Sequence, residues 1–286
     1  MVFAKHAYIC AFLFSINVAM VPWVYSLGAS IFLFLFLRFS TTFLLSVIVT
    51  RRLMPINEIR QKGLVGWYLL LTLLIGLQSV FFIAAVEYMP VGLASATLFT
   101  FPLMTYIMEK CVQKKTPSYS IVFIFIIAII GIGLLSQPGG QSESIMLGLL
   151  LALLSALTQA VIMHFTPKIA VMNNWEMAKC TSILPASMFF LLYLYGGGSV
   201  LTVTSGMIAA VVAGMFFAAA VFFYYSSIRI YGATRTANIM FFEPLIVLFI
   251  GAMAYNDQIT FIQYIGVAMV ALSSLMIERK QINQHV

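Results

Sequence analysis

Ten stretches of about 20 apolar residues run through this chain, and they limit its fold more than any other feature. A helix of that length crosses the hydrocarbon core of a lipid bilayer. In lipid such a segment must be helical, because an open sheet would leave backbone groups without hydrogen bonds. We therefore predict an all-α integral membrane protein with ten transmembrane helices, near residues 6–25, 30–50, 64–86, 91–111, 118–136, 145–165, 177–195, 205–226, 235–255 and 260–277.

The balance of apolar and charged residues excludes a soluble fold. Of the 286 residues, 63% are hydrophobic and 8% are charged, whereas a soluble domain carries about 25% charged residues. The net charge of +7 could suggest a nucleic-acid partner, but the charges lie in short loops between apolar stretches rather than on one face. This placement is typical of membrane orientation, so we expect no nucleic-acid partner.

The basic residues fall almost entirely on one side of the membrane when the amino terminus is placed in the cytoplasm. Of the 15 Lys and Arg residues, 14 then lie in inner segments: Lys5, Arg51, Arg52, Arg60, Lys62, Lys110, Lys114, Lys115, Lys168, Lys179, Arg229, Arg235, Arg279 and Lys280. The outer loops hold only the acidic residues Glu87, Glu143 and Asp257. By the positive-inside rule, this distribution predicts a multi-pass protein with both termini cytoplasmic.

The two halves of the sequence resemble each other at a constant shift of 142 residues. The aligned pairs include Phe99 with Phe241, Pro102 with Pro244, and Leu103 with Leu245. Charge character is exchanged between the halves, since the basic loop 51–62 aligns with the uncharged "GGGS" at 196–199. We predict two inverted five-helix repeats, residues 1–140 and 141–286, as in many transporters. A chance alignment of apolar helices is the alternative.

Several short motifs resemble the EamA-type members of the drug/metabolite transporter superfamily. They are Phe14, Ser15 and Asn17 in the first span, "LRF" (37–39) in the second, and "EPL" (243–245) in the ninth. The resemblance covers roughly residues 6–277. It implies a multi-pass carrier of the bacterial inner membrane, often an exporter of metabolites or toxic compounds, with a central cavity lined by spans 1, 3, 4, 6, 8 and 9. The family's Gly-Glu at the ends of spans 4 and 9 is replaced here by "QKK" (113–115) and "YND" (255–257).

Motifs for enzymatic chemistry and for ATP-driven transport are absent from the sequence. There is no G-x-x-x-x-G-K-[ST] loop, no H-E-x-x-H and no G-x-S-x-G. We therefore expect no enzyme activity, no cofactor and no metal. The function expected is secondary transport of a small organic molecule by alternating access, with export favoured over import. A membrane scaffold or channel subunit is the alternative from another class. The expected partners are a small-molecule substrate and the lipid bilayer, with a homodimer left open.

Two charged residues lie near the middle of apolar spans, where a charge is costly. Glu243 lies eight residues after Arg235, and Arg38 lies eight residues after Ser30. An intramembrane carboxylate is by default a functional candidate. Glu243 could bind a substrate amine or a proton beside the break created by Pro244, or it could pair with Arg38 and hold spans together. We interpret Arg38 as a structural charge.

Other polar residues and prolines complete the candidate site. Asn17 and Gln159 align under the repeat, and their amides could bind substrate or associate helices. Pro102 and Pro244 each remove a backbone hydrogen bond and are interpreted as matched hinges, with static kinks as the alternative. Further residues expected to line the cavity are Gln78, Tyr224 and Asn238.

Overall fold

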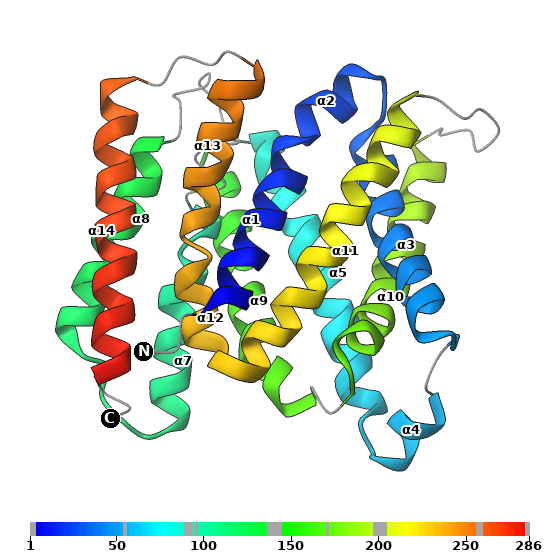
Figure 1. Cartoon of the computed structure of the whole chain (residues 1–286), viewed down its shortest axis with the longest axis horizontal. Coiled ribbons are helices and arrows are strands. Elements are labelled where there is room, and N and C mark those ends of the chain that lie inside the picture. The colour runs from blue at the N-terminus through cyan, green and yellow to red at the C-terminus, as the bar shows by residue number, and fades with distance from the viewer. Residues whose placement is uncertain are drawn as a thin grey trace. The chain divides into compact units, whose positions relative to one another are not determined.

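The computed structural model describes residues 4–53, 56–88, 94, 97–135, 145–169, 172–196, 205–255 and 260–283. Within these ranges every regular element is a helix, which confirms the predicted all-α class (Figure 1). The helices are α1 (Lys5–Ala19), α2 (Val21–Ser26), α3 (Ile31–Thr50), α4 (Ile56–Gln61), α5 (Val65–Tyr88), α7 (Phe101–Val112), α8 (Tyr119–Leu135), α9 (Ile145–Ile169), α10 (Asn174–Tyr195), α11 (Ser205–Tyr231), α12 (Ala233–Ile239), α13 (Phe242–Tyr255) and α14 (Phe261–Asn283).

Seven helical segments in the described ranges are long and apolar enough to cross a membrane. They are Lys5–Ser26, Ile31–Thr50, Val65–Tyr88, Ile145–Pro167, Asn174–Tyr195, Ser205–Tyr231 and Ala233–Ala254. Two shorter apolar helices, Tyr119–Leu134 and Phe261–Ile277, match the predicted fifth and tenth spans. The predicted fourth span begins at residues outside the described ranges. Glu143, Asp257 and the loop after Gly196 also lie outside these ranges. The count of ten therefore stays a prediction.

The chain divides into two compact units. Unit 1 contains Met1–Gly76 and Lys168–Arg229, and unit 2 contains Leu77–Pro167 and Ile230–Val286. Each unit combines segments from both halves of the sequence, and the predicted boundary between residues 140 and 141 stays a prediction. In unit 1, α3 packs along α10. In unit 2, α8 packs along α14, and α7 packs on α12 (Figure 1).

The packing of unit 1 depends on small residues and on side chains that reach neighbouring helices. A Cβ atom on Gly214 of α11 would lie 2.9 Å from the Cβ of Thr41 in α3, so only glycine fits there without a shift. The Sγ of Cys10 in α1 donates to the carbonyl of Ala220 in α11, at 3.4 Å. Small residues at helix contacts are typical of membrane bundles, where close approach of the backbones supplies the packing energy.

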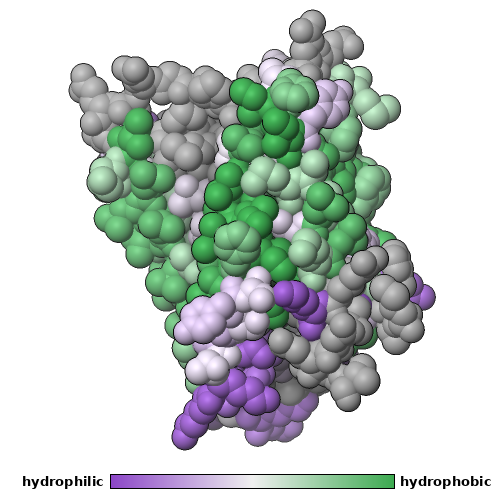
Figure 2. Space-filling model, turned by 90° about the vertical axis from the view of Figure 1, so that its left-hand side faces the viewer, coloured by the Kyte–Doolittle hydropathy of each residue, from purple (hydrophilic) through white to green (hydrophobic). Residues whose placement is uncertain are grey.

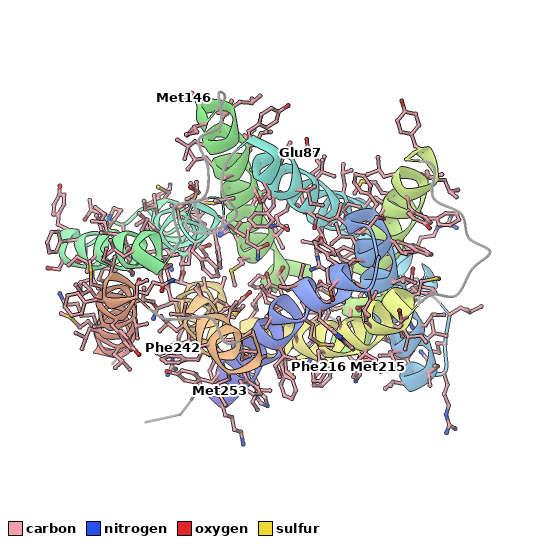
Figure 3. All side chains as sticks on the ribbon, turned by 90° about the horizontal axis from the view of Figure 1, so that it is seen from above. Glu87, Met146, Met215, Phe216, Phe242 and Met253 are labelled. Carbon is pink, nitrogen blue, oxygen red and sulfur yellow. The ribbon has the colours of Figure 1, made fainter. Side chains whose placement is uncertain are left out.

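The packing of unit 2 uses alanines and glycines in the same way. Ala85 of α5 and Ala152 of α9 are fully buried in one cluster with Ala94. In the end-on view of Figure 3, Glu87 of α5 and Met146 of α9 lie toward the same edge. Figure 2 shows that hydrophobic side chains form a broad band on the face toward the viewer, with hydrophilic side chains gathered at its lower end. This distribution is the one expected for a membrane-embedded face ending at an aqueous interface.

Candidate functional site

The predicted ninth span is interrupted just before Glu243. Helix α12 ends at Ile239, and α13 begins at Phe242. Pro244 has no N–H to give to the carbonyl of Met240 four residues earlier, and that carbonyl accepts the N–H of Glu243 instead, at 3.0 Å. Pro244 thus lies in the first turn of α13, where a missing N–H costs little.

The interruption explains how a carboxylate fits into this apolar run. Glu243 is the second residue of α13, and it is half-buried. The backbone N–H groups at a helix N-terminus and the helix dipole both stabilise a negative charge there. The chain therefore supplies a favourable position for a carboxylate inside a segment that is otherwise hydrophobic.

The predicted fourth span is interrupted at the corresponding place. Residues 99 and 100 form a turn, α7 begins at Phe101, and Pro102 is in its first turn. The ring of Phe99 lies 6.5 Å from the ring of Phe241, measured between centroids. Phe241 also lies 5.8 Å from Phe125 of α8. The two interruptions therefore meet in unit 2 through the phenylalanines that the 142-residue shift aligns.

Asn238 lies close to the break in the ninth span along the chain, and a second carboxylate, Glu109 of α7, contacts α12 one turn before it. Asn238 is fully buried in the last turn of α12, and its carbonyl accepts the N–H of Phe241 at 3.2 Å. One turn earlier, the hydroxyl of Thr234 donates to Oε2 of Glu109 in α7. The other oxygen of Glu109 accepts from Nε2 of Gln113, at 3.1 Å. The residues near the break thus include a buried amide and a hydrogen-bonded carboxylate.

Sequence reasoning missed Glu109. It lies beside Lys110 at the end of the predicted span 91–111, and we counted that end as an inner loop. The signal that could have found it is an acidic residue two helical turns after Pro102, still within the apolar run.

Gln78 and Gln159 both belong to unit 2. Nε2 of Gln78 in α5 donates to Oγ of Ser155 in α9 at 3.2 Å, and Ser155 donates to the carbonyl of Gln78 at 2.9 Å. Gln159 is half-buried one turn further along α9. The two glutamines therefore lie on elements that are joined by a reciprocal pair of hydrogen bonds.

Asn17 belongs to unit 1 and binds a neighbouring backbone. Its side chain is 1% exposed, and Nδ2 donates to the carbonyl of Ala213 in α11 at 2.8 Å. This bond supports helix association, one of the two interpretations that the sequence left open. The alignment partner of Asn17, Gln159, lies in unit 2.

Tyr224 and Arg38 belong to an aromatic cluster in unit 1. The ring of Phe14 lies 6.3 Å from Tyr224 and 5.6 Å from Phe217. The guanidinium carbon of Arg38 lies 4.2 Å from the centroid of Phe217 and 5.1 Å from that of Phe39. Cation–π contacts of this kind contribute about 0.5–2 kcal/mol each, and most when desolvated. The cluster offers a physical reason for an arginine inside a span.

Lys179 is a second site that the sequence did not reveal. It is fully buried in α10, and its Nζ donates to Oγ1 of Thr50 at 2.8 Å and to the carbonyl of Arg52 at 2.9 Å. These acceptors lie at the C-terminal end of α3, where the helix dipole favours a cation. From sequence, Lys179 looked like an inner-loop charge; its position three residues into the predicted span 177–195 was the available signal.

Comparisons with known proteins agree with this fold. Residues 146–279 match the family described as the EamA-like transporter family. One of 29 matching solved chains, titled only as the crystal structure of a protein, has a TM-score of 0.74 at 15% sequence identity. The alignment covers 95% of this chain and 96% of that chain, and at this identity it shows the fold alone. No curated protein sequence matches the chain.

Proposed function

Since residues 146–279 match the EamA-like transporter family of the drug/metabolite transporter superfamily, we propose that this multi-pass membrane protein is a secondary carrier. Its substrate would be a small organic metabolite or drug, moved by alternating access. Export is favoured, and import is the second candidate. The observation that carries the proposal is the pair of interrupted spans, each broken just before a proline, that meet through Phe99 and Phe241.

The contacts within each unit support two inverted halves of five helices. The 142-residue shift relates the second span to the seventh, the fourth to the ninth and the fifth to the tenth. Two of these pairs are α3 with α10 and α8 with α14, and the members of each pair are in contact. In the fourth and ninth spans, α7 contacts α12, whereas the shift aligns α7 with α13. Elements that contact their own repeat mates are expected beside a twofold axis. Inverted halves of this kind give inward-open and outward-open states of similar energy.

Roles in substrate binding and in the conformational change are proposed for the candidate residues. Glu243 would bind a substrate amine or a proton, because a half-buried carboxylate can change its charge when its surroundings change. In unit 2, Asn238, Gln78 and Gln159 would supply polar contacts to the substrate; for Tyr224 of unit 1 the same role stays a prediction. Pro102 and Pro244 would act as hinges, since each lies in the first turn of the helix that follows an interruption. The roles of Asn17 and Arg38 would be to hold helices of unit 1 together.

The proposed topology has ten spans in a bacterial inner membrane, with both termini in the cytoplasm. Cys111 provides a native probe, because it is exposed at the end of α7 while Cys10 and Cys180 are buried. An impermeant thiol reagent should label Cys111 only after the cell is opened. A cysteine introduced at Ser199, outside the described residues, should be labelled from outside. The reverse labelling would contradict this orientation.

Solute counterflow in proteoliposomes tests the carrier cycle directly. Vesicles loaded with a candidate solute should take up labelled external solute transiently, because only a carrier exchanges internal for external molecules. A scaffold would give no uptake, and a channel subunit would give equilibration without the transient. Untargeted comparison of metabolites inside and outside cells, with and without the protein, would supply the candidate solutes and the direction.

A further inference from the structure

A lysine just after the end of helix α7 has a backbone conformation that glycine usually adopts. Lys114 has a φ of 54°. Its N–H donates to the carbonyl of Cys111 at 3.1 Å, and the next N–H, of Lys115, donates to the carbonyl of Lys110 at 2.9 Å. This pair of bonds is a Schellman motif, whose left-handed position is usually occupied by glycine.

Helix α4 shows the usual form of the same motif. There the left-handed residue is Gly63, with a φ of 65°. Its N–H donates to the carbonyl of Arg60 at 3.0 Å, and the N–H of Leu64 donates to the carbonyl of Ile59 at 3.0 Å. A side chain at such a position is strained, because its Cβ approaches the following carbonyl oxygen. Lys114 therefore persists at a place where glycine would be the less strained residue, which suggests a use for its side chain.

The lysines around this helix end form a charged patch of Lys110, Lys114 and Lys115. Lys114 and Lys115 are exposed, and Nζ of Lys110 lies 5.5 Å from the ring centroid of Tyr106. Neighbouring Glu109 accepts a hydrogen bond from Gln113 at one carboxylate oxygen and from Thr234 at the other. Both donors are neutral, so Glu109 keeps its negative charge, and three lysines beside one carboxylate leave the patch with a net positive charge.

The surroundings of this lysine patch are ordered and partly apolar. The hydroxyl of Tyr106 accepts the N–H of Ser118 at 3.1 Å, which fixes the connection between α7 and α8. Two large apolar side chains lie in the open beside the lysines, Val112 at 63% exposure and Tyr119 at 92%. In Figure 1 the connection between α7 and α8 lies at the lower end of the picture, and Figure 2 shows hydrophilic side chains gathered at the lower end, below the hydrophobic band. Tyrosine beside a basic cluster at such a boundary is typical of the membrane interface.

We propose that the lysine patch binds the head group of an anionic phospholipid, and that Tyr119 and Val112 contact the part of its acyl chains nearest the head group. The negative phosphate complements three lysines, and a lipid presents charge and apolar surface at the depth where the patch and its apolar neighbours lie. A free phosphate would use the charge alone and leave Tyr119 and Val112 in water. This inference is independent of what the protein transports.

The test uses full-length protein in neutral maltoside micelles, titrated with short-chain phosphatidylglycerol. Binding is followed by native mass spectrometry and by the rise in the melting temperature Tm. Phosphatidylglycerol should raise Tm, whereas phosphatidylcholine of the same chain length should not. Lys114→Gln and Lys115→Gln should each weaken binding about fivefold, the effect of one basic residue at a membrane surface. A shift that inorganic phosphate reproduces in full would overturn the lipid assignment.

Two variants separate a lipid site from general surface charge and from helix capping. Lys62→Gln removes one exposed charge beside the glycine cap of α4 and should leave phosphatidylglycerol binding within twofold of wild type. Lys114→Gly should raise Tm without lipid, because it relieves the strained backbone, and should lose most of the lipid-induced shift. Equal weakening by Lys62→Gln would show unspecific attraction and contradict the proposal. A lower Tm for Lys114→Gly without lipid, or an undiminished lipid shift, would contradict it as well.

Discussion

The two compact units use their polar residues differently. In unit 1, Asn17, Thr72 and Lys179 each donate to a main-chain carbonyl of another element. In unit 2, Ser155 also donates to a main-chain carbonyl, that of Gln78, but the bond between α7 and α12 joins two side chains, and α12 and α13 are separate pieces of one predicted span. A main-chain carbonyl is a fixed acceptor, whereas a side-chain partner can be exchanged. We infer that unit 1 is a framework and that unit 2 contains the parts that change during a transport cycle.

The largest effect is expected for the carboxylate beside the break in unit 2. Glu243→Gln keeps the shape of the side chain and removes its charge and its titration. Transport should fall at least tenfold, and its dependence on pH should be lost, while the amount of protein in the membrane stays normal. Initial rates of counterflow between pH 5 and pH 8 measure both. Arg38→Met is the comparison in unit 1, and it should lower protein levels instead.

The double variant of Arg38→Met with Glu243→Gln distinguishes two roles for the carboxylate. If Glu243 acts alone, the two changes should have independent effects on rate and on protein level. Partial rescue of protein level in the double variant would show instead that the two residues form a structural pair. If Glu243→Gln leaves the transport rate and its pH profile unchanged, Glu243 has no part in the mechanism. The main reason to assign the moving parts to unit 2 is then lost.

The next largest effect concerns the buried lysine of the framework. Lys179→Met keeps the apolar stem and removes both hydrogen bonds to the end of α3. Hydrogen bonds to charged groups contribute about 1.5–3 kcal/mol each, so we expect a loss of about 2 kcal/mol or more and a Tm several degrees lower in detergent. Lys62→Met, at an exposed site, should change stability by less than about 0.5 kcal/mol. Similar Tm values for the two variants would contradict a framework role for Lys179.

Much of the fold could be predicted from sequence because long apolar stretches carry their own signal. The helical class and most spans follow from length and hydropathy alone. The direction in which each helix faces does not, because a helix such as α1 does not gather its polar residues in one stripe. The sequence therefore did not predict that Asn17 faces α11.

The sequence predicted site residues only where a residue was chemically unusual among its sequence neighbours. Glu243 and Pro244 indicate from the sequence that the span is interrupted. The exact position of the interruption, at Met240 and Phe241, depends on which backbone carbonyl lacks its usual donor, and the sequence does not show this. Lys179 was missed because its acceptors, Thr50 and Arg52, lie more than 120 residues away along the chain. Long-range hydrogen bonds of this kind leave no local pattern.

A smaller effect tests whether unit 2 is packed as tightly as unit 1. A Cβ on Gly131 of α8 would lie 2.9 Å from Val270 and 3.1 Å from the carbonyl of Gly266, both in α14. Gly131→Ala should therefore cost about 1–3 kcal/mol, as overpacking does. Gly133→Ala, two residues along the same helix, meets nothing within 4 Å and should be neutral or gain up to about 1 kcal/mol. Thermal unfolding in detergent compares them; equal Tm values would show that α8 and α14 are loosely packed.

The smallest effect on stability, and the finest test of the comparison, concerns the prolines. Pro102→Ala and Pro244→Ala change first-turn positions, where the missing N–H costs little, so Tm should move by no more than a few degrees. Either variant allows the two pieces of its span to join as one helix, so transport should slow severalfold while substrate binding survives. Pro185 lies inside α10 in unit 1, and Pro185→Ala should leave the transport rate unchanged. If Pro185→Ala slows transport as much as Pro244→Ala does, the motion is not confined to unit 2, and the division into framework and moving parts is wrong.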